Sequence, residues 1–227
     1  EQCDIMAHSV RRILESGECV VPHKLPESKA DLSTHIDWTE YLTDSILKDV
    51  DTTVSLAKVR QVAEVFERLP EGFQLQASVE KIVADRLKMT AGALSIDWGY
   101  AELMAYGTLL QQGYSIRLSG QDSGRGTFFH RHAVLHNQVD GSSYVPLREL
   151  GDKNSNFRVF DSLLSELAVL GFEYGFSTTE PKTLVLWEAQ FGDFANGAQV
   201  VIDQFISAGE HKWGRASGLV MLLPHGF

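Results

Sequence analysis

The sequence is poor in cysteine and in positive charge. Its two cysteines, Cys3 and Cys19, lie in one short segment without CxxC spacing. This indicates neither a disulfide framework nor a cysteine zinc site, and we expect a reducing compartment. Twenty lysine and arginine residues against thirty aspartate and glutamate residues give a formal net charge of −10. That sign opposes attraction to phosphate backbones, so we expect no nucleic-acid partner.

Long apolar runs are also missing. No run reaches the ~18 residues that suggest a membrane span, and the acidic first residues lack the basic start of a secretory signal. We therefore expect no membrane partner. With 44% hydrophobic and 22% charged residues, the composition is that of an ordinary globular protein. A length of 227 residues predicts one large domain or one domain with an arm.

Glycine is scarce in the first part of the chain. Residues 1–97 hold three of the nineteen glycines, and residues 98–227 hold the other sixteen. Apolar spacing and proline positions in the first part predict a short helix ending at Gly17, an extended connection over 20–38, and amphipathic helices over 56–69 and 79–87. We find no catalytic motif there, so the first part is interpreted as a helical connector.

The second part alternates between helix and strand patterns. The apolar strand TLVLWEA is typical of a strand buried on both faces. In the helix that precedes it, we expect Ala168, Phe172 and Gly175 to face the sheet. The alternation predicts an α/β fold with a parallel sheet covered by helices on both faces. The predicted helices cover 97–112, 162–177 and 195–208, and the predicted strands cover 114–118, 183–189 and 218–223.

Parallel sheets of this kind bind ligands outside the carboxyl ends of their strands. That rule selects Gln121 and Asp122 after the first strand, residues 188–194 after the second, and His225 after the third. Glu166 belongs at the same edge if its helix begins there. These residues are the first candidates for a functional site.

The segment HRHAVLH carries the most conspicuous cluster of one residue type. His132 and His136 are four residues apart on a possible helix, and His130 precedes them by two. Two imidazoles at that spacing can share a metal ion, as in zinc proteases. The general-base glutamate of that motif is missing, so hydrogen bonding or contact with an anionic ligand is the alternative.

The loop SGQDSGRGTF, residues 119–128, also has two interpretations. Its glycines let backbone N–H groups approach an anion, and Arg125 and Arg131 add positive charge, so the loop could cradle a phosphate. It matches neither the Walker pattern nor GxGxxG. An ordinary surface turn is the alternative.

Glu166 stands in a helix so apolar that most of it must be buried. A buried glutamate without a cation tends to stay protonated, and it could then donate a proton to a ring nitrogen. A solvated glutamate favoured by the helix dipole is the alternative.

Aromatic rings and polar groups are concentrated in WEAQFGDFANGAQ. Phe191 and Phe194 could stack on a flat ring, while Glu188, Gln190 and Asp193 fix its polar edge. The same rings could belong to the core, because periodicity does not separate the two possibilities.

Four segments of residues 98–227 resemble one enzyme family closely and in the same order. They resemble the pyrimidine-binding domain of the thiamine-diphosphate-dependent first component of 2-oxoglutarate dehydrogenase complexes. The resemblance implies a transketolase-like α/β domain over 98–227, truncated at its C-terminal end, and an interdomain connector over 1–97. The segments are RLSGQDSGRGTFFHRHAVLHNQ, FDSLLSELAVLGFEYGFSTTEP, LWEAQFGDFANGAQVVIDQFISAGEHKWGR and GLVMLLPHG.

The resemblance implies oxidative decarboxylation of 2-oxoglutarate in the tricarboxylic acid cycle. Thiamine diphosphate is the electron sink of the reaction, and the succinyl unit passes reductively to a lipoyl group of a partner succinyltransferase. Such enzymes bind the cofactor between two subunits, so a homodimer is implied. The magnesium and diphosphate ligands, in a GDG motif followed by Asn, belong to an upstream domain that this sequence does not contain. We therefore expect the chain alone to be inactive.

Roles are implied residue by residue. Glu166 is similar to the family's activating glutamate, which hydrogen-bonds the aminopyrimidine nitrogen. Phe191 and Phe194 lie in the segment that packs on the pyrimidine, with Phe191 the better stacking candidate. Asp122 matches a carboxylate position beside the cofactor, and Gln190 adjoins the stacking segment.

Three histidines are candidates for the substrate side of the site. His130 and His132 could pair with a substrate carboxylate, and His225 could relay a proton. The family continues beyond His225 with a Gly- and His-containing loop and a further domain. Two alternatives stay open: a metal-dependent hydrolase using His130, His132 and His136, and the related enzyme specific for 2-oxoadipate. The expected location is the bacterial cytoplasm, with the mitochondrial matrix as the alternative.

Overall fold

A computed structural model of the chain describes residues 2–17, 36–42, 49–152 and 155–225. The chain divides into two compact units, Glu1–His35 and Ile36–Phe227. In the first unit, helix α1 (Gln2–Ser16) ends before Gly17, whose φ of +66° is readily adopted by glycine, as the sequence predicted. Most of the predicted extended connection over 20–38 lies outside the described residues.

The second unit is built on a four-stranded parallel sheet with strand order β4-β1-β5-β6. The central strand β1 (Ser115–Gly120) pairs with β4 (Phe157–Asp161) on one side and with β5 (Thr183–Glu188) on the other. The edge strand β6 (Val220–Leu222) pairs with β5. Three of these strands were predicted, and β4 was missed. A short antiparallel pair, β2 (Leu135–His136) and β3 (Ser143–Tyr144), was also missed.

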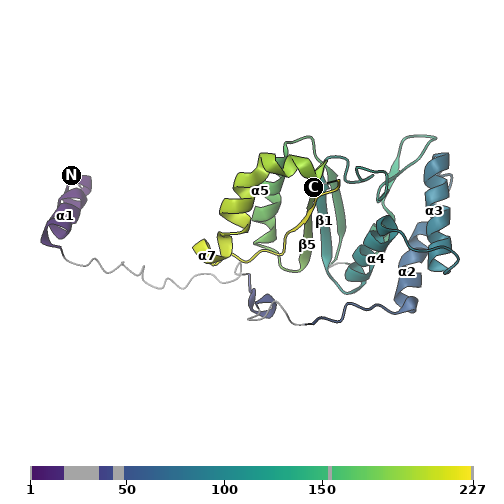
Figure 1. Cartoon of the computed structure of the whole chain (residues 1–227), viewed down its shortest axis with the longest axis horizontal. Coiled ribbons are helices and arrows are strands. Elements are labelled where there is room, and N and C mark those ends of the chain that lie inside the picture. The colour runs from purple at the N-terminus through teal and green to yellow at the C-terminus, as the bar shows by residue number, and fades with distance from the viewer. Residues whose placement is uncertain (1, 18–35, 43–48, 153–154, 226–227) are drawn as a thin grey trace. The chain divides into compact units, whose positions relative to one another are not determined.

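Helices cover both faces of the sheet. Successive side chains of β5 point to opposite faces, and each packs on a different set of helices. Leu186 joins a core formed with α2 (Leu56–Glu67), α3 (Ala77–Thr90) and α4 (Trp98–Gln111), whereas Trp187 joins a second core formed with α5 (Glu166–Ser177). Figure 1 shows β1 and β5 between α4 and α5. The predicted parallel α/β fold is confirmed.

Helix starts follow from local capping. The side-chain oxygen of Asp97 accepts a hydrogen bond from the backbone N–H of Tyr100 at 2.7 Å, which fixes the start of α4. Gln76 similarly accepts the N–H groups of Ser78 and Val79 at the start of α3. Gly113, with φ of +88°, ends α4 where the sequence predicted.

The buried face of α5 differs from our prediction. The residues expected to face the sheet are not buried, and Phe172 is 61% exposed. The helix is apolar on nearly every side, so its composition does not mark the side that packs on the sheet. The buried residues of α5 are Glu166, Val169, Leu170, Glu173, Tyr174 and Ser177.

The predicted helix over 195–208 is irregular. It consists of a 3₁₀ segment η4 (Gly192–Ala198), one turn α6 (Gln199–Val201) and a π-helical turn η5 (Ile202–Ile206), followed by α7 (Gly209–Trp213). Two further 3₁₀ segments are η2 (Thr39–Tyr41) and η3 (Pro146–Leu150). Among the described residues, no helix is both long and apolar enough to cross a membrane.

Candidate functional site

The segments that follow β1, β5 and β6 meet at the carboxyl edge of the sheet, as the strand pattern predicted. After β5, the side-chain amide of Gln190 donates to Asp122, which follows β1, at 2.9 Å. The N–H of Gly192 donates to the carbonyl of Pro224, which follows β6, at 2.8 Å. This edge therefore brings together residues from three strand ends and from the start of α5.

Glu166 is the first residue of α5 and is 9% exposed. Its Oε1 accepts a hydrogen bond from the backbone N–H of Gln190 at 3.1 Å. Its Oε2 is buried and has no hydrogen-bond partner among the described residues. A buried carboxyl oxygen without a partner is costly, so this atom is available to a polar ligand at the sheet edge.

An aromatic cluster lies around Phe191, which directly follows Gln190, the residue whose N–H binds Glu166. The ring of Phe191 is within 5.7–6.1 Å, centroid to centroid, of the rings of Phe128, Phe194 and His225. Phe191 is partly exposed, and Phe194 is 48% exposed. Rings in edge-to-face contact with exposed surface can receive a flat ligand ring.

Among the described residues, four non-glycine residues adopt the left-handed backbone conformation, and all lie in the segments that follow β1 and β6. Asp122, Phe129, His132 and His225 have φ between 43° and 57°. Such backbone is unfavourable for residues with a side chain and persists only where surrounding contacts impose it. The concentration of this strain after the strand ends supports a functional role for the edge.

The loop over 119–128 forms a tight turn in which three backbone N–H groups donate to acceptors within the protein. The N–H of Gly124 donates to the carboxylate of Asp161 at 2.7 Å, and the N–H groups of Arg125 and Gly126 donate to the carbonyl of Asp122. The guanidinium of Arg125 pairs with the Asp122 carboxylate at 2.8 Å. These contacts favour the surface-turn interpretation over a phosphate cradle. Asp161, at the end of the missed strand β4, was not recognised from the sequence.

The histidine segment is not a helix. Residues 130–134 are irregular, and His136 lies in β2 with an exposed side chain, so the i,i+4 geometry assumed for His132 and His136 is wrong. The described residues contain no group of three His, Cys, Asp or Glu side chains that could hold a metal ion. The HxHxxxH metal site, and with it the hydrolase alternative, has no structural support.

His130 and His132 are both partly buried beside arginines. Burial, and after it the positive charge of Arg131, lowers the pKa of His130. Burial, followed by the charges of Arg86 and Arg125, lowers the pKa of His132. Both causes disfavour the imidazolium form, so these side chains favour the neutral state, in which one nitrogen can accept a hydrogen bond. The Nδ1 atom of His130 is buried and has no partner among the described residues.

We expected Glu188 to contact the polar edge of a ligand, but it is paired with an arginine instead. Its carboxylate forms two hydrogen bonds with the buried guanidinium of Arg131, at 2.7 and 2.8 Å. Gln190 does contribute to the edge, but through contacts within the protein. Its side-chain amide donates to Asp122, and its backbone N–H donates to Glu166. Asp193 is exposed. Arg131 and Glu188 are 57 residues apart, so no local sequence pattern could have predicted that they pair.

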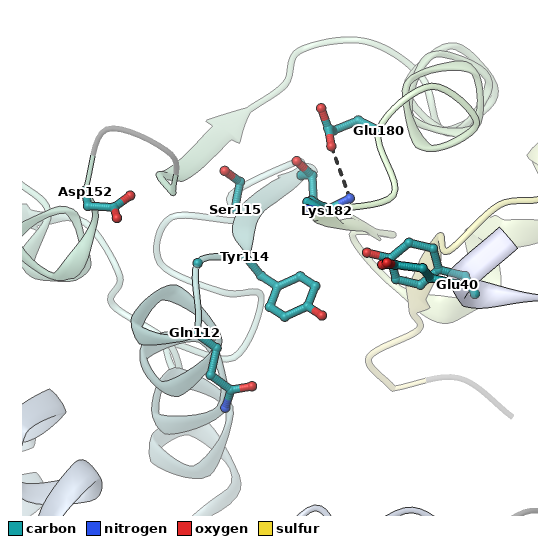
Figure 2. Close-up of a pocket in the computed structure, with 10 residues that line it drawn as sticks. Glu40, Gln112, Tyr114, Ser115, Asp152, Glu180 and Lys182 are labelled. Carbon is teal, nitrogen blue, oxygen red and sulfur yellow. Dashed lines mark hydrogen bonds between the residues drawn. The ribbon is translucent and has the colours of Figure 1, made fainter. Parts of the chain in front are cut away.

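A separate cavity of about 610 Å³ lies at the opposite, amino edge of the sheet. Figure 2 shows Tyr114 and Ser115 from the start of β1, and Lys182 with Glu180 just before β5. The N–H of Lys182 donates to the Glu180 carboxylate at 3.1 Å. Glu40 and Asp152 also line the cavity. Three carboxylates against one lysine disfavour an anionic ligand there, despite the cavity's size.

Fold and sequence comparison together define the class of the domain. Residues 95–227 match the family of the transketolase pyrimidine binding domain. That range covers the whole parallel sheet and more than half of the chain, so the chain belongs to this family.

Individual proteins similar to the chain share one name. The chain is 52% identical over 227 residues to a 2-oxoglutarate dehydrogenase E1 component of Haemophilus influenzae. It is 49% identical to proteins of the same name from Azotobacter vinelandii, over 227 residues, and Coxiella burnetii, over 229 residues. Each alignment covers 100% of this chain and 24% of the relative. The chain thus spans about a quarter of the length of these relatives.

Proposed function

We propose that the chain is part of a 2-oxoglutarate dehydrogenase E1 component, in which it provides the pyrimidine side of a thiamine diphosphate site. The observation that carries this proposal is the buried Oε2 of Glu166, which has no hydrogen-bond partner among the described residues and lies at the edge where Phe191 follows Gln190. The relatives are named as 2-oxoglutarate dehydrogenase components, which supports 2-oxoglutarate as the substrate. The reaction we propose is its oxidative decarboxylation, with transfer of the succinyl unit to a lipoyl group.

The residues at the sheet edge fit an aminopyrimidine. The backbone N–H of Gln190 fixes one oxygen of Glu166, so the other oxygen has a defined direction. A ring nitrogen of the ligand would satisfy it, and the ring of Phe191 would pack on the pyrimidine with Phe194 at the rim. Asp122, held by Gln190 and Arg125, adds a carboxylate to the same edge.

Thiamine diphosphate, when bound, would supply the electron sink that decarboxylation of a 2-oxo acid requires. The part of this chain in that chemistry is proton control. Glu166 would hold and move a proton at the ring nitrogen, because its burial separates the carboxyl group from bulk water.

The substrate side of the site is assigned to three histidines. His130 and His132 favour the neutral form, and His225 lies against Phe128 and Phe191. We propose that His130 and His132 hydrogen-bond the substrate and that His225 relays a proton to it. Magnesium and diphosphate ligands would come from the upstream domain, with residues 1–97 as the connector.

We propose a homodimer with the active site across its subunits. Residues at the start of α5 present an apolar surface next to Glu166: Leu163 is 99%, Leu164 61% and Leu167 43% exposed. Burying these side chains against a second subunit would remove apolar surface from water, which favours association. It would also place the second subunit beside the catalytic edge.

Leu163→Arg in the full-length enzyme is expected to weaken the dimer at least tenfold, because each subunit would bring a charge to this surface. Val139→Arg is the matched control, since Val139 is 65% exposed and lies in the turn between β2 and β3. Sedimentation velocity measures both variants. An unchanged dimer in Leu163→Arg would remove this surface from the interface.

The remaining assignments rest on the relatives. We propose a lipoyl-bearing succinyltransferase as the partner component, and the bacterial cytoplasm as the location, since the three relatives above are bacterial. The 2-oxoadipate enzyme remains the alternative for substrate length.

A comparison of three 2-oxo acids as substrates tests the proposed function. Carbon dioxide release by the full-length enzyme, with thiamine diphosphate and magnesium, is measured for 2-oxoglutarate, 2-oxoadipate and pyruvate. We expect kcat/KM for 2-oxoglutarate to exceed that for 2-oxoadipate by roughly 10- to 200-fold, the range one methylene supports. A preference for 2-oxoadipate would establish the alternative. No release from any of them would refute the proposal.

A further inference from the structure

Arg131 is a fully buried cation at the centre of the catalytic edge. Its side chain is 0% exposed, and each of its guanidinium nitrogens donates to an acceptor. Nη1 and Nη2 donate to the two carboxylate oxygens of Glu188 at 2.7 and 2.8 Å. Nε and Nη2 donate to Glu102, and Nη1 also donates to the carbonyl of Ser123 at 2.8 Å.

These bonds join three separate segments. Glu102 lies in α4, Glu188 is the last residue of β5, and Ser123 lies in the turn after β1. Burial acts to lower the pKa of Arg131, but its hydrogen bonds to Glu188 and Glu102 outweigh that effect and raise the pKa above its ordinary value. The guanidinium therefore stays charged in the interior.

The contacts of Arg131 lead directly to the activating carboxylate. Glu188 is two residues before Gln190, whose backbone N–H donates to Glu166. Ser123 directly follows Asp122, which accepts from the Gln190 side chain. Arg131 therefore holds both segments that fix the position of Glu166 and Asp122.

Arg131 also lies in the segment that carries the histidines. It stands between His130 and His132, and Arg86 of α3 donates to the carbonyls of His130 and Arg131 at 2.9 and 2.7 Å. Gly99 of α4 leaves room for this backbone, because a Cβ there would lie 2.2 Å from the His130 carbonyl oxygen. The segment is thus clamped from α3, α4 and β5.

We propose that Arg131 is a positioning residue for the reaction of this site. It touches no substrate; it sets the Gln190 N–H against Glu166 and orients the backbone of His130 and His132. A buried ion triad is weak evidence for stability, since well-packed apolar residues often serve as well. Its location between the segments that hold the catalytic groups supports positioning. The inference rests on the proposed function above.

The matched control is a second arginine–glutamate pair of the same sheet. Arg117 of β1 forms two hydrogen bonds with Glu173 of α5 at 2.7 and 2.9 Å, and the side chains are 13% and 2% exposed. Arg117 contacts neither the turn after β1 nor the segment after β5 through these bonds. Arg117→Lys and Arg131→Lys therefore both break a bidentate buried pair, but only Arg131 bonds to the residue before the segment of Gln190 and to the turn of Asp122.

The experiment measures both lysine variants in the full-length enzyme. For Arg131→Lys we expect kcat for 2-oxo acid decarboxylation to fall 30-fold or more and KM to change less than threefold. Hydrogen exchange of the backbone peptide containing Gln190, followed by mass spectrometry of the folded enzyme, should accelerate at least tenfold. For Arg117→Lys we expect a similar loss of thermal stability with kcat and Gln190 exchange within threefold of wild type.

Three results would overturn the proposal: wild-type kcat with wild-type Gln190 exchange in Arg131→Lys, equal kcat losses in both variants, or a kcat loss that matches only the unfolded fraction. Should wild-type enzyme decarboxylate no 2-oxo acid, the proposed function fails. The exchange of the Gln190 peptide then still decides whether Arg131 holds that segment, so the two failures are distinguishable.

Discussion

Glu166→Gln in the full-length enzyme is expected to lower kcat for 2-oxoglutarate decarboxylation by roughly 10²- to 10⁴-fold, the contribution typical of a positioned acid or base. The amide fills the same volume and can still accept the Gln190 N–H, so the fold should persist. It cannot hold and release the same proton at a ring nitrogen. Steady-state kinetics and circular dichroism measure the two properties.

Glu210→Gln is the control for this substitution. Glu210 is exposed on α7, so its amide variant should keep wild-type turnover. Near-normal turnover by Glu166→Gln, with the cofactor bound, would remove Glu166 from the catalytic role.

Phe191→Ala is expected to weaken cofactor binding about 10- to 100-fold while reducing the stability of the apoprotein by less than ~3 kcal/mol. Phe191 is partly exposed and lies against three other rings, of which Phe128 and Phe194 are exposed, so its removal leaves little closed cavity. A fully buried phenylalanine costs ~3–5 kcal/mol on truncation. Calorimetry with thiamine diphosphate and magnesium gives the affinity, and urea denaturation of the apoprotein gives the stability.

Phe157→Ala supplies the opposite case. Phe157 of β4 is 0% exposed in the core, so its truncation should cost ~3–5 kcal/mol and leave the affinity of the folded protein nearly unchanged. The same pattern in Phe191→Ala would return Phe191 to the core and contradict its stacking role.

The sequence predicted those elements that depend on a single residue, such as a helix cap, or on a continuous apolar run. Asp97 caps α4, Gly113 ends it, and the apolar run over 183–188 forms the strand buried on both faces. Strand β4 was missed because FRVFD combines polar and apolar residues in a short edge strand. The π-helical turn over Ile202–Ile206 was also missed, because its apolar spacing hardly differs from that of an α-helix.

The residues of the candidate site that follow strand ends were predicted, but those that depend on distant contacts were not. The rule for carboxyl strand ends placed Asp122, Gln190, Phe191 and His225 together with Glu166, and the structure brings them to one edge. Arg131 was misjudged as a loop charge, because its partners are distant in the sequence. Orientation around α5 was wrong because the helix is apolar on both sides.

A crystal structure of the full-length enzyme with thiamine diphosphate and magnesium tests the central claim most directly. We predict that a carboxyl oxygen of Glu166 lies at a hydrogen-bonding distance of ~2.6–3.2 Å from a pyrimidine nitrogen, with the Phe191 ring packed on the pyrimidine. A pyrimidine bound away from this edge, for instance in the cavity beside Tyr114 and Lys182, would contradict the account.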